Sequence, residues 1–275
     1  MRRTTLCTFA ALLLVASCNK KSPPPPEETP APTAPAAPTG QPAAEPVAAE
    51  AAGDYQGGEV AGGGTITGTV SYAGSEKDAK VTITKDEATC CSACKVKEKM
   101  AGAIVVAGGK LANAIVYLPD VKKGKKMTPA TVTVDNNGCE FVPHVAIGYK
   151  GASIAAKNSD PVLHNTHLFL SQGAGASQKD LVNIALPTQG QTVEKPLKKA
   201  GVVSVKCDAH EWMQAWVFVA TNPYAVVTGK DGSFSLDGVP AGDHAVKVWH
   251  EKFGEKDGKV TVASGGKAKL DFAFN

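Results

Sequence analysis

The hydrophobic positions along this chain fall into many short runs, and Gly, Asp, Asn or Pro separates one run from the next. Such alternation and punctuation are typical of half-buried β-strands. No stretch carries the three-turn apolar stripe of an amphipathic helix, and only Cys94–Met100 suggests a short helical turn. The region from residue 65 to the C-terminus is therefore predicted to be all-β, as sandwiches or barrels. Expected strands include residues 65–72, 113–118, 130–134, 201–206 and 215–219.

The C-terminal part has a distinct pattern of strands and turns. Residues 228–236 read as a strand, an Asp-Gly turn and a strand, and residues 239–244 contain a second turn. This run resembles the carboxypeptidase regulatory-like (transthyretin-like) domain. That family begins with strands like residues 68–70 and 112–118, which lie far upstream here.

The resemblance implies a transthyretin-like sandwich that another domain interrupts. Its two parts would be residues 65–126 and 222–275, with an insert at 127–221. Insertion at a loop is tolerated because the ends of a domain often lie close together. Two sandwiches in sequence, the first of them irregular, remain the alternative.

The first 17 residues have the features of an export signal. A charged Met1-Arg2-Arg3 start precedes an apolar run too short to span a bilayer. Residues 15–18, Val-Ala-Ser-Cys, resemble the bacterial lipobox, which implies a lipid on Cys18. The expected location is the periplasmic side of a bacterial cell envelope, anchored through this lipid. Asn19, in place of Asp, favours the outer membrane. An ordinary signal peptide with an incidental Cys18 is the alternative.

Residues 18–64 are predicted to form a disordered linker. They hold more than half of the chain's 18 Pro, many Ala and almost no large apolar side chain. Such a segment cannot bury a core and adopts extended polyproline conformations. Gly57-Gly58 and the glycines at 62–64 are expected to end it with a flexible joint.

The cysteine count points to one special thiol. Once Cys7 leaves with the signal and Cys18 carries lipid, Cys90, Cys91, Cys94, Cys139 and Cys207 remain. In an oxidising compartment an odd cysteine is a free thiol or a metal ligand. If Cys207 binds metal, the other four can form two disulfides. Three pairings are possible, with a bridge from the Cys90–Cys94 cluster to Cys139 preferred.

Charge adds little to this picture. The net charge of +3 comes from residues spread along the chain, and two of the basic ones, Arg2 and Arg3, lie in the signal. No basic field indicates nucleic acid as a partner, so any charge complementarity must be local.

The segment Cys207–Met213 carries the chain's most specific chemistry. It places a thiol, an imidazole and a thioether at every third position: Cys207, His210 and Met213. Two His, one Cys and a weak axial Met are the ligands of blue-copper sites. The chain has four Met, so a chance Met at this position is improbable.

A second His must come from elsewhere. Between residue 127 and Cys207 the choices are His144, His164 and His167. Side chains three apart on a strand point to opposite faces, so only one of His164 and His167 can face the site. His144 is expected to be a strand histidine with a local partner.

The run His164-Asn165 together with the Cys-x-x-His-x-x-Met loop resembles the cupredoxins of the amicyanin and plastocyanin type. The resemblance implies a Greek-key sandwich over residues 127–221 that holds one type 1 copper. His164, Cys207 and His210 would be equatorial ligands and Met213 the axial one. Asn165 would hydrogen-bond across to the segment beside Cys207. In the family the loop His reaches the surface, so His210 would be the electron port.

Other readings of these residues stay open. Cys207 could be half of a disulfide, or Cys91 and Cys94 could join Cys207 and His210 around zinc. Covalent haem at Cys94 is excluded because Lys95, not His, follows it. Trp212 would either shield the copper or form part of a docking surface. His244 and His250 are expected to be structural, with residues 249–251 at the surface.

The resulting hypothesis is a membrane-tethered blue-copper protein that carries single electrons between redox partners, such as a cytochrome or an oxidoreductase. Because no acid–base pair or substrate pocket is evident, it is not expected to be an enzyme by itself. One alternative is a copper-binding scaffold lipoprotein whose regulatory-like domain binds a surface partner or glycan. Another is an electron-donor subunit of a redox enzyme.

Overall fold

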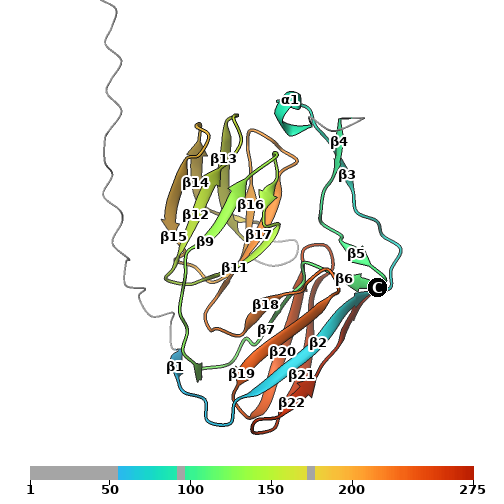
Figure 1. The fold of residues 1–275 in the computed structure, drawn as a ribbon, viewed down its shortest axis with the longest axis vertical. Coiled ribbons are helices and arrows are strands. Elements are labelled where there is room, and N and C mark those ends of the chain that lie inside the picture. Colours follow the sequence, from blue (N-terminus) through green and yellow to red (C-terminus); the bar gives the residue numbers. More distant parts are fainter. Residues whose placement is uncertain (1–54, 92–96, 172–176) are drawn as a thin grey trace, which may run out of the picture. The chain divides into compact units, whose positions relative to one another are not determined.

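The computed structural model describes residues 55–91, 97–171 and 177–275. The predicted signal peptide, Cys18, Cys94 and most of the predicted linker lie outside the described residues. Within the described ranges the regular structure is strand except for one short helix, α1 Glu87–Cys90, as Figure 1 shows. No helix in those ranges is long and apolar enough to span a membrane. The all-β prediction is confirmed.

Two sheets take strands from both the early and the late parts of the described chain. Their orders are β18-β7-β20-β21 and β19-β2-β6-β5, and β22 and β23 also pair with β2. Strands from before residue 126 and after residue 221 therefore pair with one another. The strands are β2 Gly64–Tyr72, β5 Val106–Ala107, β6 Lys110–Leu111, β7 Ile115–Tyr117, β18 Ala225–Val227, β19 Ser233–Val239, β20 Gly242–His250, β21 Gly254–Val262, β22 Lys267–Lys269 and β23 Phe272–Phe274.

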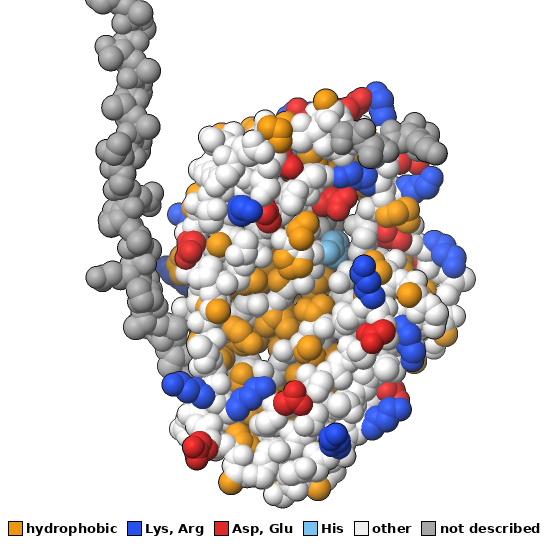
Figure 2. All heavy atoms as spheres, viewed as in Figure 1, with side chains coloured by type: hydrophobic (Ala, Val, Ile, Leu, Met, Phe, Trp, Pro, Cys, Tyr) orange, Lys and Arg blue, Asp and Glu red, His pale blue; other side chains and the backbone are white. Residues whose placement is uncertain are grey.

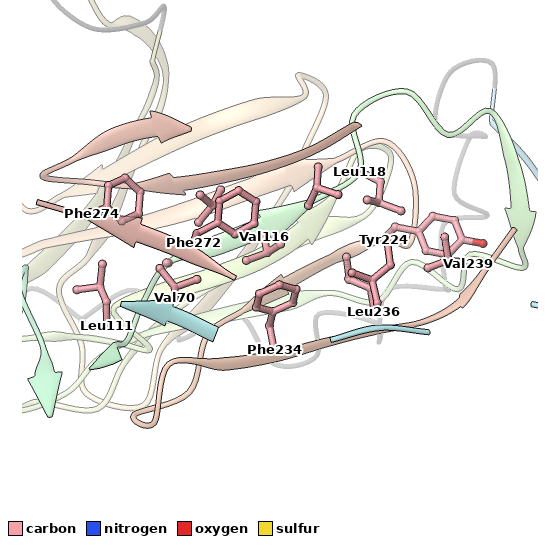
Figure 3. Packing of buried hydrophobic residues seen from close by; sticks show 14 of the residues in the cluster. Val70, Leu111, Val116, Leu118, Tyr224, Phe234, Leu236, Val239, Phe272 and Phe274 are labelled. Carbon is pink, nitrogen blue, oxygen red and sulfur yellow. The ribbon is translucent and has the colours of Figure 1, made fainter. Parts of the chain in front are cut away.

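The side chains of β2 alternate strictly between buried and half-buried positions. Its inward residues Ile66, Val70 and Tyr72 join one apolar core with residues of the facing strands (Figure 3). At Gly68 a Cβ atom would lie 1.8 Å from the carbonyl oxygen of Leu270. A glycine is therefore needed where the C-terminal segment passes beside β2.

The residues between these parts form two further sheets. Their orders are β10-β9-β12-β15 and β11-β17-β16-β13-β14. Both parallel and antiparallel neighbours occur, since β12 pairs parallel with β9 and antiparallel with β15. The strands are β9 Val132–Asn136, β10 Phe141–Val142, β11 Val145–Tyr149, β12 Ser153–Asn158, β13 His164–Leu170, β14 Lys179–Leu186, β15 Thr192–Pro196, β16 Gly201–Lys206 and β17 Gln214–Ala220.

Strand β17 is buried on both faces. Ala215, Val217 and Val219 point into the core of their own sandwich, which also contains Cys207 and Met213. The alternate residues Trp216, Phe218 and Ala220 belong to a second cluster with Ile115 of β7. In Figure 2 apolar side chains gather in the middle of the face shown, over β11 and β18.

Two local predictions are wrong. Residues 55–64 are not a flexible joint, because β1 Gln56–Gly58 pairs in parallel with β8 Lys123–Lys125. The Tyr55 hydroxyl also donates to the carbonyl of Lys125 at 2.6 Å, which fixes the segment. The end of the suggested helical turn is instead a strand, β4 Glu98–Met100, which pairs with β3 Lys80–Thr82.

The expectation that residues 249–251 lie at the surface is also wrong. His250 is fully buried, stacked on Phe253 with ring centroids 4.8 Å apart. Burial lowers its pKa to about 4. Its neighbour Glu251 is bound to His144 from 107 residues away, so the expectation of a local partner for that histidine is also wrong.

We predict that His250 makes stability pH-dependent in the acid range. Between its ordinary pKa of 6.5 and its folded value of about 4, the unfolded chain binds a proton that the folded chain does not. Lowering the pH through this window therefore destabilises the fold, by about 1.4 kcal/mol per pH unit. Urea unfolding at pH 6.5 and 4.5 should show a smaller pH effect in His250→Phe, by about 2 kcal/mol.

The control is Val246→Ala, at a fully buried position of the same strand, which removes core packing but no titrating group. It should lower stability equally at both pH values. An unchanged pH dependence in His250→Phe would contradict the assignment.

Candidate metal centre

Strand pairing brings the two ligand-bearing segments together. β13 begins at His164, and its neighbour β16 ends at Lys206, paired antiparallel so that His167 lies opposite Lys206. The first residues of β13 therefore lie beside the loop that follows β16. That loop, residues 207–213, turns tightly, with the Met213 N–H donating to the His210 carbonyl at 2.9 Å, and leads directly into β17.

Three of the four predicted ligands present their donor atoms to one point. The Cys207 Sγ lies 3.8 Å from His164 Nδ1 and 3.6 Å from His210 Nδ1, and the two Nδ1 atoms are 3.0 Å apart. For a first-row metal such as zinc, bonds of about 2.0 Å to nitrogen and about 2.3 Å to thiolate imply ligand separations of about 3.3–3.8 Å. The two distances from the Cys207 Sγ fall within this range, whereas the 3.0 Å between the two nitrogens is shorter. A single ion could be bound by all three residues if the two rings moved slightly apart.

The opposite nitrogen of each imidazole is held by a carboxylate. His164 Nε2 lies 3.0 Å from Asp160 Oδ2, and His210 Nε2 lies 3.0 Å from Asp86 Oδ2. Donation to these acceptors requires the proton on Nε2, which leaves an unprotonated lone pair on each Nδ1. Two lone pairs facing each other at 3.0 Å repel unless a cation lies between them. The donor set therefore fits a metal ion.

The centre is closed to solvent. His164 and His210 are fully buried, Cys207 and Met213 are 2% exposed, and Met213 belongs to the same apolar cluster as Cys207. Burial lowers the pKa of His164 and raises the pKa of the Cys207 thiol. Both shifts disfavour charge, so an ion would meet neutral donors in a dry pocket.

Asn165 joins the two segments. Its Oδ1 accepts the backbone N–H of Asp208 at 2.7 Å and that of Ala209 at 3.3 Å, and also faces the Cys207 thiol at 3.4 Å. Its amide group donates to Asp208 and Asn183. Asn165 thereby connects the start of β13 to the backbone of the loop that follows β16.

His167 points to the other face of β13. It lies between Asp208 and Asp180, which outweigh the effect of partial burial and raise its pKa. The same contact contributes to the lowered pKa of Asp208, against the opposing effect of that residue's own burial.

A segment from outside the strand sandwich covers His210. Asp86, directly before α1, binds its Nε2, and the Cys90–Cys139 disulfide fastens α1 to the loop before β10. His210 was expected to reach the surface, and that expectation is wrong. Trp212 lies beside it, with ring centroids 5.0 Å apart, and donates from Nε1 to the Cys139 carbonyl at 3.2 Å.

The disulfide is one of the pairings that the sequence left open. Cys91 is also disulfide-bonded, and among the described residues Cys207 is the free cysteine. Sequence reasoning missed Asp86 and Asp160. Asp160 lies four residues before His164, which was a usable signal, whereas nothing local marks Asp86.

No protein-family model matches this chain, and no curated protein matches it. Among solved structures it is similar to a copper-containing nitrite reductase from Thermus scotoductus SA-01, at 20% identity and TM-score 0.27, covering 35% of this chain and 24% of that one. It is also similar to amicyanin from Paracoccus versutus, at 18% identity and TM-score 0.27, covering 33% and 81%. A purple cupredoxin from Nitrosopumilus maritimus matches at 20% identity and TM-score 0.27, covering 32% and 99%. At these scores the likeness is coarse and extends over about a third of the chain.

We predict that Asn165→Ala destabilises the metal-free protein by about 1–3 kcal/mol, because the Asp208 and Ala209 N–H groups lose their acceptor. Urea unfolding measures this loss. The matched control is Asn183→Ala, an exposed neighbour in the same hydrogen-bond group. Its loss should be clearly smaller, and equal losses would refute a special role for Asn165.

Proposed function

We propose that this protein binds one copper ion at the candidate metal centre and carries single electrons. The observation that carries the proposal is the convergence of two imidazole Nδ1 atoms and one thiol, 3.0–3.8 Å apart, in a buried site. Two His, one Cys and a nearby Met are the blue-copper donor set. Bound copper would supply a Cu(II)/Cu(I) one-electron couple.

For electron transfer, the residues of the chain would hold the ligands in fixed positions. His164 and His210 are oriented by Asp160 and Asp86, and the Cys207 loop is held by Asn165. Ligands fixed in this way move little when the charge of the site changes. The Met213 thioether, buried in the same core, would be available as a fourth, weaker ligand.

Electrostatics of the surrounding groups would favour a cation. Asp160 and Asp86 place carboxylates at the outer nitrogens of both imidazoles, which raises the basicity of the donor atoms. The closed apolar surroundings keep water from the site and so limit loose ligand exchange.

We further propose that the protein works as a tethered carrier in the bacterial envelope, on the basis of the lipobox-like sequence at Cys18 and the Pro-rich segment after it. Its partner would be a redox protein such as a cytochrome or an oxidoreductase. Because Asp86 covers the His210 edge, that partner would not approach the imidazole directly.

The test is addition of Cu(II) to the full chain. An intense thiolate-to-copper visible band is expected, and Cys207→Ala, His164→Ala and His210→Ala should each abolish it. His167→Ala is the matched control, since its ring lies on the opposite face of β13, and it should keep the band. A colourless or loosely bound product in the unmodified chain would overturn the proposal.

Voltammetry separates electron transfer from copper storage. Fast reversible one-electron waves are expected for a carrier. Tight binding of copper without a reversible wave would favour the storage or scaffold alternative.

A further inference from the structure

Most routes to the candidate metal centre are closed by hydrogen-bonded groups. Asp86 covers the outer side of His210, Asp160 that of His164, and Asn165 faces the Cys207 thiol. An ion that enters this site in the folded protein therefore needs another path.

A cavity reaches the remaining ligand, Met213. It encloses about 100 Å³, and its walls come from β3, β4, the Cys139 loop and the start of β17. A water molecule occupies about 30 Å³ in the liquid. The cavity therefore has room for an ion with a few small ligands. Its lining includes Met100, Cys139, His144, Trp212 and Met213.

Two methionines line this cavity and differ in exposure. Met213 is 2% exposed, whereas Met100 on β4 is 54% exposed and ranks among the exposed large hydrophobic residues. The chain has four Met, so two of the four on one small cavity is a marked concentration. Thioether and thiolate ligands select Cu(I) among biological metals.

Fixed charge in the cavity is largely neutralised. Lys99 pairs with Glu140 at 3.2 Å, and His144 is bound to Glu251. A monovalent soft cation would therefore meet no strong repulsion, and a thioether would be its best ligand at the mouth.

We propose that this cavity is the entry route for Cu(I), with Met100 as the first ligand at its mouth and Met213 as the next. The step is ligand exchange without a change of oxidation state. The ion passes from a small solution ligand to Met100, then to Met213 and the Cys207 sulfur, whose thiol proton is released to solvent. This inference rests on the proposed copper function.

The test measures loading rates of the metal-free full chain mixed with Cu(I) stabilised by acetonitrile. Samples are quenched at intervals with a strong Cu(I) chelator, whose colour reports the copper not yet bound. Met100→Leu should load Cu(I) about tenfold more slowly, which corresponds to about 1.4 kcal/mol. The final amount of bound copper should not change, because Met100 is not a ligand of the finished site.

Two comparisons make the result specific. Met127→Leu, a change at the half-buried Met between β8 and β9, should load at the unmodified rate. Loading of Cu(II), which thioethers bind poorly, should be equal in Met100→Leu and the unmodified chain. Equal Cu(I) rates in Met100→Leu and the unmodified chain, or an equal slowing of Cu(II), would overturn the entry route. Failure of the unmodified chain to bind any copper would instead refute the proposed function on which the route rests.

Discussion

The antiparallel pairing of β13 with β16 is the constraint on which the candidate metal centre depends. It sets His164 at the start of one strand beside the loop that leaves the other. Asn165 then fastens that loop through the backbone N–H groups of Asp208 and Ala209. A slip of one residue would turn His164 away and bring the wrong side chain inward. The backbone brings the His164 and His210 side chains together. The hydrogen bonds to Asp160 and Asp86 then fix the orientation of the two imidazole rings.

Sequence reasoning succeeded where the signal was local and periodic. Short alternating runs gave the strands, and the expected strand at residues 201–206 coincides with β16. The strand-parity argument separated His164 from His167, which the structure turns to opposite faces. The metal-donor residues could be proposed because Cys207, His210 and Met213 lie on one short loop and His164 lies at the start of one strand. In each case the information lay within a few residues of the feature it predicted.

The failures involve contacts between distant segments. Gly57-Gly58 was predicted to be a flexible joint. The composition of this segment gives no sign that it pairs as a strand with β8. Residues 249–251 read as polar surface because Phe274, which packs against His250, and His144, which pairs with Glu251, come from elsewhere in the fold. The burial of His210 could not be foreseen, since Asp86 lies 124 residues away. Such contacts leave no periodic trace in the sequence.

Strand β17 has a consequence for any attempt to exchange one part of this fold. Its residues Ala215, Val217 and Val219 fill one core, and Trp216, Phe218 and Ala220 fill another that Ile115 shares. A stretch grafted into a pre-existing sandwich would leave Trp216 and Phe218 bare unless β7 and β20 changed with it; Trp249 of β20 now lies 5.1 Å from Trp216 between ring centroids. Replacing either part of the fold by another domain would therefore require transplanting these aromatic residues as a set.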